Sequence, residues 1–292
     1  MYREASEQSS LLQGLLIPLI ALVALSAAVA IPSGMRLKGL GILWGWTLLG
    51  FLILAVAARR TLHRLRARGL QIKVMPNTFP EMKQLLSRMC KQLGIREPEA
   101  FVVRGEHRSF QTLGLWAPYF MILDETVWEP LNPAELEALV AHELGYIRSG
   151  HVFWRTLVLT AQELHPLWRL LGLPLQLFAA CLRMAWMNII EFTADRVALL
   201  LTRDPQVCIS ALLKRAVEMD PTSNLEPHEI DDYLRRGPLS VQAQDVEDHY
   251  RVGTFVRSHP LLQARLEDLV RFGQSDLAKQ CWRVMEESSG EG

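Results

Sequence analysis

The stretch AHELGYIRSGH, residues 141–151, lies near the end of an apolar, helix-prone segment. Residues four positions apart on a helix share one face, so His142 and Tyr146 project to the same side. Glu143 follows His142 directly and carries the acidic group of the stretch. These three side chains form the first candidate for a functional site.

The pattern differs by one letter from H-E-x-x-H, in which two histidines on one helix face bind Zn²⁺ and the glutamate activates a metal-bound water. His142 and Glu143 hold the first two positions, and Tyr146 stands in place of the second histidine. Tyrosine must lose a proton to bind a metal, and its ordinary pKa is about 10. A nearby Zn²⁺ lowers such a pKa, so ligation by Tyr146 stays open at a cost in affinity.

The residues before the motif predict a well-formed helix. Asn132 can cap it, Pro133 suits the first helical position and Glu135 completes a capping box. Gly150 can end it. The motif therefore lies on the last turns of this helix.

A second segment, NIIEFTADRVALLL, carries two carboxylates on one helix face, because Glu191 and Asp195 are four residues apart. Carboxylates in an apolar stretch are costly unless they are paired or bind a metal. One interpretation is a pair of salt bridges, for instance from Asp195 to an arginine. The other is a metal site shared with His142 and Glu143.

Three segments follow the order of motifs in the HtpX-like membrane zinc peptidases, a family that includes the CAAX prenyl proteases: ELEALVAHELGYI, EFTADRVAL and RSHPLLQARLEDL. The sequence resembles this family over roughly residues 75–272. The resemblance implies a gluzincin-like metallopeptidase with a Zn cofactor. It also implies substrates among membrane or misfolded proteins, and thus a role in protein quality control.

By position, the resemblance implies that His142 and Glu191 are zinc ligands, with Tyr146 at the place of the missing histidine. Glu143 would be the general base, and Asp195 would orient a ligand. Loss of one ligand of three is expected to weaken zinc binding severely.

Four other histidines are possible substitutes for the missing ligand. The resemblance places His259 near the site, where it could stabilise an oxyanion; it equally suits the entry to the helix that starts at Pro260. His151 falls on the opposite helix face from His142. His165 fits a structural or interfacial role, and His107 has no visible partner.

Three functions follow from these patterns. The first is a membrane-bound zinc endopeptidase that holds an extended peptide by strand pairing near residues 100–124. The second is a catalytically dead pseudopeptidase, a membrane-tethered binding or regulatory module in which Tyr146 hydrogen-bonds Glu191 or Glu143. The third is a membrane scaffold with an accidental motif, which the agreement of three segments disfavours.

Residues 1–58 predict a transmembrane hairpin with helices at about 11–31 and 39–58, because each run is uncharged and close to the roughly 20 apolar residues that cross a bilayer. The basic linker 59–74 holds five arginines between residues 59 and 68, against two basic residues in the connecting loop. The positive-inside rule then predicts an integral, multi-pass membrane protein whose globular domain faces the cytoplasm.

The globular domain at 75–272 is predicted as mainly helical α+β with a small antiparallel sheet, built from AFVVRG, SFQTLGL and YFMILDE. An apolar helical hairpin at 153–190 is expected to lie on the membrane, to pack on the domain or to enter the bilayer. Residues 273–292 are expected to form a C-terminal tail whose last residues, EESSGEG, lack folded structure.

The amino-acid composition indicates which classes of binding partner to expect. Lys plus Arg equals Asp plus Glu at 31 each, so the charge balance points away from nucleic acid. The four cysteines are widely spaced, which predicts reduced, mostly buried thiols. The expected partners are the lipid bilayer and a protein or peptide substrate.

Overall fold

The computed structural model describes residues 72–103, 110–162, 188–220, 225–235, 251–252, 255–256 and 260–290. The chain divides into two compact units, Met1–Arg68 with Val152–Ile190 and Gly69–His151 with Glu191–Gly292. Every described element except α6 and the first residues of α9 lies in the second unit.

The strands are β1 (Ile72–Lys73), β2 (Glu99–Val103), β3 (Phe110–Leu113) and β4 (Phe120–Asp124). The helices, in chain order, are α3 (Pro80–Leu93), α4 (Glu125–Trp128), α5 (Pro133–Ser149), α6 (Val152–Gln162), α9 (Asn188–Thr202), α10 (Pro205–Met219), α11 (Pro227–Arg235), α13 (Pro260–Gln274) and α14 (Asp276–Gly290). The described part of the chain is mainly helical with one small sheet, as the sequence predicts.

The sheet has the order β1-β2-β4-β3 and is mixed, so the prediction of an antiparallel sheet was wrong. β2 and β4 pair in parallel, whereas β1–β2 and β3–β4 are antiparallel. All five residues of β4 are buried, which suits a central strand with neighbours on both edges. Strand β4 thus lies between β2 and β3, and β3 is the last strand of the described sheet on that side.

Helix α5 begins and ends where the sequence predicts. The Asn132 side chain accepts from the backbone N–H of Glu135, and the Glu135 side chain accepts from that of Asn132, which confirms the predicted capping box. Gly150 ends the helix in the left-handed conformation at φ 76°, also as predicted. Every residue from Ala138 to Tyr146 is buried, as expected for a helix covered on all sides.

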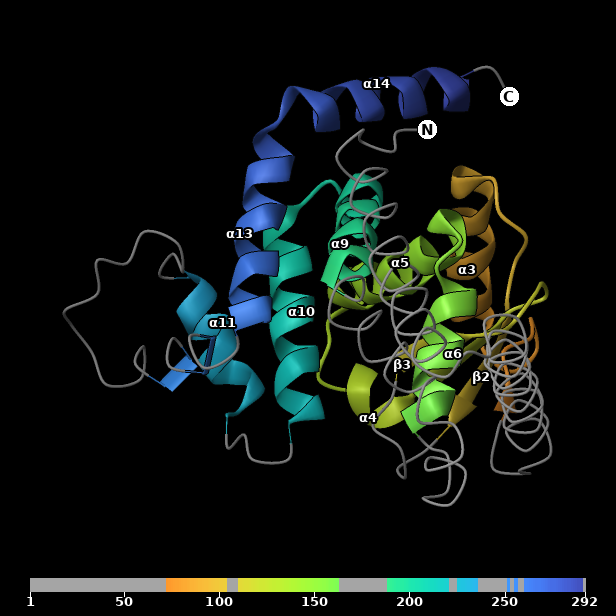
Figure 1. Cartoon of the computed structure of the whole chain (residues 1–292), viewed down its shortest axis with the longest axis horizontal. Helices are drawn as coiled ribbons and strands as arrows, with labels where there is room; N and C mark the ends of the chain where they lie inside the picture. The colour runs from red at the N-terminus through yellow and green to blue at the C-terminus, as the bar shows by residue number, and fades with distance from the viewer. Residues whose placement is uncertain are drawn as a thin grey trace, which may run out of the picture. The chain divides into compact units, whose positions relative to one another are not determined.

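Two helices and one strand of the described part of this unit pack directly against α5. Helix α5 contacts α3, α10 and β3, and α10 contacts α11 and α13. In Figure 1, α10 and α13 run alongside each other, and α14 turns away from the end of α13. The polar motif of α5 is thus surrounded by packed secondary structure.

The C-terminal segment differs from its prediction. Most of residues 273–292 form helix α14, which extends through Gly290. Its Ala278 is fully buried, and Leu277 and Trp282 pack on the core. An apolar helix face therefore joins this segment to the domain, so the expectation that EESSGEG lacks structure was wrong for its residues up to Gly290.

The predicted membrane segments 11–31 and 39–58 lie outside the described residues, as does most of the hairpin 153–190. None of the helices that the structure describes combines the length and apolarity that a bilayer span requires.

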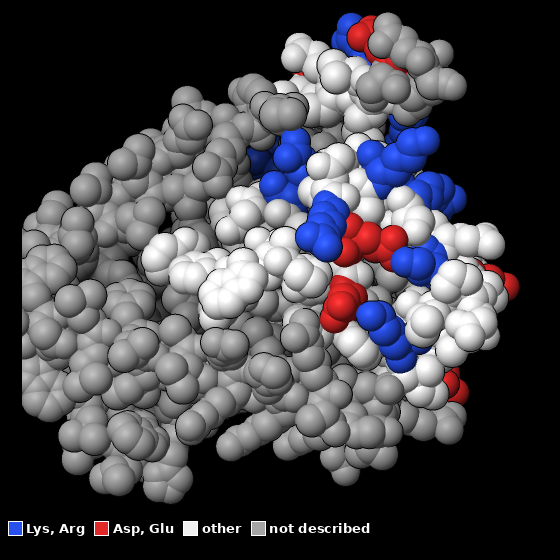
Figure 2. Space-filling view, turned by 90° about the vertical axis from the view of Figure 1, so that its right-hand side faces the viewer, with Lys and Arg blue, Asp and Glu red and all other residues white. Residues whose placement is uncertain are grey.

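Basic and acidic side chains are interspersed over the described part of the face shown in Figure 2.

Candidate active site

Helices α5 and α9 cross closely at the motif, and Gly145 makes this approach feasible. A Cβ at Gly145 would lie 2.9 Å from Cα of Ala194 and 3.2 Å from its carbonyl oxygen. Such a contact is shorter than any that a real side chain makes, so glycine is required for this spacing. As a result, the face of α5 that carries His142 and Tyr146 meets the face of α9 that carries Glu191.

The Tyr146 hydroxyl lies between the two groups that the sequence assigned to a metal. It donates to Oε1 of Glu191 at 2.5 Å and lies 3.1 Å from Nε2 of His142. The Tyr146 side chain is fully buried. Glu191 is one of the two hydrogen-bond partners expected for Tyr146 in the pseudopeptidase hypothesis.

Asp195 holds the other ring nitrogen of His142. Its Oδ1 lies 2.8 Å from Nδ1 of His142, which directs the Nε2 side of the ring towards Tyr146. Both oxygens of Asp195 also accept from the Arg265 guanidinium, at 2.7 and 2.8 Å. Burial alone would raise the pKa of Asp195, but the charges and hydrogen bonds of Arg265 and His142 lower it to about 2.

Arg265 pairs with the second carboxylate as well. Its Nη1 lies 3.0 Å from Oε2 of Glu191. Burial opposes the charged guanidinium, yet Asp195 and Glu191 raise the pKa of Arg265 above its ordinary value. The two carboxylates of α9 therefore form the salt bridges that the sequence left as one interpretation, and both bridges use the same arginine.

Glu143 is hydrogen-bonded to residues of β3 and α10. Its Oε2 accepts from the backbone N–H of Thr112 on β3 at 2.6 Å, and its Oε1 accepts from Nη2 of Arg215 on α10 at 3.1 Å. Glu143 and Thr112 are fully buried, and Arg215 is nearly so. The residue predicted as general base is thus engaged at both carboxylate oxygens.

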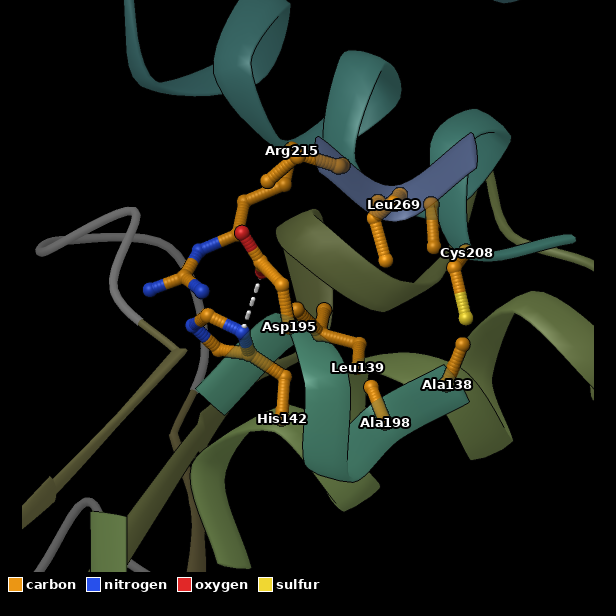
Figure 3. Close-up of a pocket in the computed structure, with 10 residues that line it drawn as sticks. Ala138, Leu139, His142, Asp195, Ala198, Cys208, Arg215 and Leu269 are labelled. Atoms are coloured by element: carbon orange, nitrogen blue, oxygen red, sulfur yellow. Dashed lines mark ion pairs between the residues drawn. The ribbon is translucent and has the colours of Figure 1, made fainter. Parts of the chain in front are cut away.

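A small cavity of about 20 Å³ lies among α5, α9, α10 and α13, which is room for about one water molecule. Figure 3 shows His142, Asp195 and Arg215 at its polar side, with small and apolar side chains such as Ala138, Ala198 and Leu269 around the remainder. Cys208 also lines it, and burial raises the pKa of its thiol to about 12. The cavity is too small for a substrate.

The structure brings together His142, Glu143, Tyr146, Glu191 and Asp195. Their assigned roles stay predictions. Among the residues described, no group of three or more His, Cys, Asp and Glu side chains has the arrangement of a metal site.

Of the four other histidines that the sequence offered as substitutes, His151 alone lies in the described part of the chain. His259, His107 and His165 lie outside the described residues. His151 is buried just after the end of α5, and its N–H donates to the Tyr146 carbonyl oxygen. This position at the end of α5 is consistent with the prediction that His151 does not share the face of His142.

Three functional partners were missed from the sequence: Thr112, Arg215 and Arg265. Arg215 follows Lys214 in the run ISALLKRAV, and two adjacent basic residues in an apolar helix were a usable signal of burial. Arg265 stands in PLLQARLEDL, where it looks like an ordinary surface arginine. Thr112 contributes a backbone group, which no side-chain pattern reveals.

Comparison with known proteins finds similarity to peptidases. Residues 76–272, more than half of the chain, match peptidase family M48. The chain is 27% identical over 219 residues to plastoglobule-localized metallopeptidase 48, chloroplastic, from Arabidopsis thaliana. That alignment covers 71% of this chain and 61% of the relative, so the chain spans about three fifths of the relative's length. No solved structure matches.

The family match covers all of the segments that carried the resemblance: the helix with His142 and Glu143, the helix with Glu191 and Asp195, and the segment RSHPLLQARLEDL, which contains His259. The narrower resemblance to HtpX-like and CAAX prenyl proteases stays a prediction. Family and relative together support a metallopeptidase-like function. The chain belongs to peptidase family M48.

Proposed function

We propose that this chain is a membrane-anchored pseudopeptidase of family M48, which keeps the peptidase fold and binds protein without hydrolysing it. The observation that carries this proposal is the Tyr146 hydroxyl, which bonds Glu191 at 2.5 Å and lies 3.1 Å from Nε2 of His142. A hydrogen-bond network thus connects the side chains that a zinc ion would connect.

Members of family M48 are generally zinc metalloproteases, so the fit of zinc to these residues is the first question. The hydroxyl oxygen of a tyrosine lies further from its Cα than the Nε2 atom of a histidine does. The difference is ~2 Å, which is also the length of a zinc–nitrogen bond. Tyr146 therefore carries its oxygen to the place that the metal would occupy if a histidine stood at this position. The contacts of that oxygen with His142 and Glu191 agree with this placement.

Charge opposes the metal as well. Arg265 lies 3.0 Å from Oε2 of Glu191 and bonds both oxygens of Asp195, so a cation already compensates these carboxylates. A divalent ion beside this guanidinium would be repelled in a buried site of low dielectric constant. The residues present do not fit zinc as they are arranged.

A zinc endopeptidase with Tyr146 as an ionised ligand is the second candidate. One observation favours it: Nε2 of His142, the Tyr146 hydroxyl and the Glu191 carboxylate converge, with Nε2 only 3.7 Å from Oε2 of Glu191. Here Glu143 would be the general base and membrane or misfolded proteins the substrates. Zinc would have to displace the phenol proton and the Arg265 contact.

Metal analysis separates the two candidates. The full-length protein, its Tyr146→His variant and a control variant Tyr119→His are purified and incubated with Zn²⁺, and bound zinc is counted per chain. The pseudopeptidase predicts no stoichiometric zinc in the wild type and the control, and about one zinc after Tyr146→His. About one zinc in the wild type would reject it in favour of the endopeptidase.

Hydrolysis of an unfolded protein such as casein gives a second readout. The pseudopeptidase predicts equal background rates for the wild type and Glu143→Gln. Wild-type cleavage that Glu143→Gln abolishes would select the endopeptidase, because that substitution removes the expected base while it preserves side-chain size.

We also propose that residues 11–31 and 39–58 anchor the chain in the membrane and that the domain faces the cytoplasm. The support is the uncharged length of both segments and the five arginines that follow the second one. Protease treatment of intact cells and of inverted vesicles, each with a tag after residue 292, tests this orientation. Digestion of the tag in intact cells would contradict it.

A further inference from the structure

Glu143 is held at the edge of the sheet by an arginine from α10. Oε1 of Glu143 lies 3.1 Å from Nη2 of Arg215, and the same nitrogen donates to the carbonyl oxygen of Phe110 at 3.0 Å. Oε2 of Glu143 accepts from the N–H of Thr112 at 2.6 Å. One ion pair therefore makes two hydrogen bonds to β3.

These two bonds fall on the same edge of the strand. Phe110 and Thr112 are two residues apart, and the outward peptide groups of a strand recur at every second residue. In the described residues β3 pairs with β4 alone, so its other edge has no neighbouring strand there. The Glu143–Arg215 pair bonds this edge as the backbone of an added strand would.

We infer that Arg215 is a positioning residue that holds Glu143 in an unproductive place, against the peptide groups that an extended substrate would pair with. This inference rests on the proposed function, since it supplies a second obstacle to peptidase activity. Tyr146 acts on the metal position, and Arg215 acts on the general base and the strand edge. The two obstacles use different residues of different helices.

The consequence is that restoring the histidine is not sufficient for catalysis. With Tyr146→His, zinc should bind, but Glu143 should stay paired with Arg215. The base should act only when Arg215 is also replaced by a neutral side chain. A protein partner of the wild type should likewise be bound elsewhere than at the peptide groups of Phe110 and Thr112.

The test compares four full-length proteins at measured, equal zinc occupancy: Tyr146→His, Tyr146→His with Arg215→Gln, the same double variant with Glu143→Gln, and Tyr146→His with the control Arg88→Gln. Arg88 also pairs with a glutamate of α5, Glu137 at 2.7 Å, but on the surface. Hydrolysis of unfolded casein is followed to obtain kcat and KM.

The expected result is a kcat about 100-fold or more higher in the double variant than in Tyr146→His alone, as is typical when a positioned base becomes available. Glu143→Gln should abolish this gain, and Arg88→Gln should give none. Equal kcat in the single and double variants, or a gain that survives Glu143→Gln, would overturn the inference.

A purely structural role of Arg215 has a separate signature. If Arg215→Gln prevents zinc loading, Arg215→Met is used, since it keeps an unbranched side chain in the buried place. Loss of zinc loading in both variants would show that Arg215 supports the fold, and would also overturn the inference. Zinc in the wild type would reject the Tyr146 proposal alone, and the Arg215 comparison would then be made in the wild-type background.

Discussion

Arg265 and Asp195 form a bidentate ion pair beneath the candidate site, with nitrogen–oxygen distances of 2.7 and 2.8 Å. Asp195 is 4% exposed and also binds Nδ1 of His142. The pair joins α13 to α9 and, through His142, to α5. One arginine therefore links three helices through its contacts with Asp195.

Replacement of Arg265 by methionine should destabilise the protein strongly. It would leave the buried carboxylate of Asp195 without its cation, and such changes typically cost about 3–5 kcal/mol. Thermal unfolding of the full-length protein in detergent measures the effect. The control is Arg88→Met, whose exposed pair with Glu137 should contribute no more than about 1 kcal/mol. Similar losses in the two variants would contradict this assignment.

Stability should fall in acid through Asp195. Its pKa is about 2 in the folded protein against an ordinary 3.8, so the folded state binds fewer protons. The contribution of Asp195 is therefore present above pH 3.8 and is lost as the pH falls from there towards 2.

Asp195→Asn should be less stable at neutral pH and should show a flatter loss of stability over that pH range. Unfolding midpoints are measured at several pH values between 4 and 2. Asp276→Asn is the matched control, because its carboxylate is 92% exposed. An unchanged slope in Asp195→Asn would show that other groups cause the acid loss.

Gly145→Ala should separate α5 from α9. The added Cβ would meet the backbone of Ala194 at 2.9 Å, and backbone cannot yield as a side chain does. Overpacking of this kind costs about 1–3 kcal/mol, and zinc loading of Tyr146→His should also be lost. Gly273→Ala is the control, because its Cβ would meet the flexible end of Leu199 at 3.3 Å. Retained zinc loading with Gly145→Ala would argue against the close crossing.

Tyr146→Phe should destabilise the protein without changing its volume much. The substitution removes the hydroxyl that Glu191 accepts from and that lies against Nε2 of His142. A buried acceptor left without its donor costs about 1–3 kcal/mol. Tyr119→Phe, at a partly exposed position, should have little effect in the same unfolding assay. An unchanged unfolding midpoint in Tyr146→Phe would show that the hydroxyl does not stabilise the site.

Local signals in the sequence were sufficient to predict the limits of several helices and strands. The cap at Asn132, the proline after it and the final Gly150 set the limits of α5, because capping depends on residues within one turn. The same rules describe α3, which begins at Pro80 and has its C-cap at Gly94. The three β-prone runs became β2, β3 and β4. The predicted antiparallel pairing was wrong for β4 and β2. Their parallel pairing arises from the order of the strands in the sheet, which no single run of residues encodes.

The helical spacing of the candidate side chains can be recognised in the sequence, since a spacing of four places His142 with Tyr146 and Glu191 with Asp195. Their partners could not be recognised there, because they come from distant helices. Arg215 lies 72 residues from Glu143 along the chain, and Arg265 lies 70 residues from Asp195. In the sequence these arginines resemble any others on amphipathic helices. Packing buries them beside carboxylates, and a buried charge must be paired, so the fold selects which arginine meets which acid.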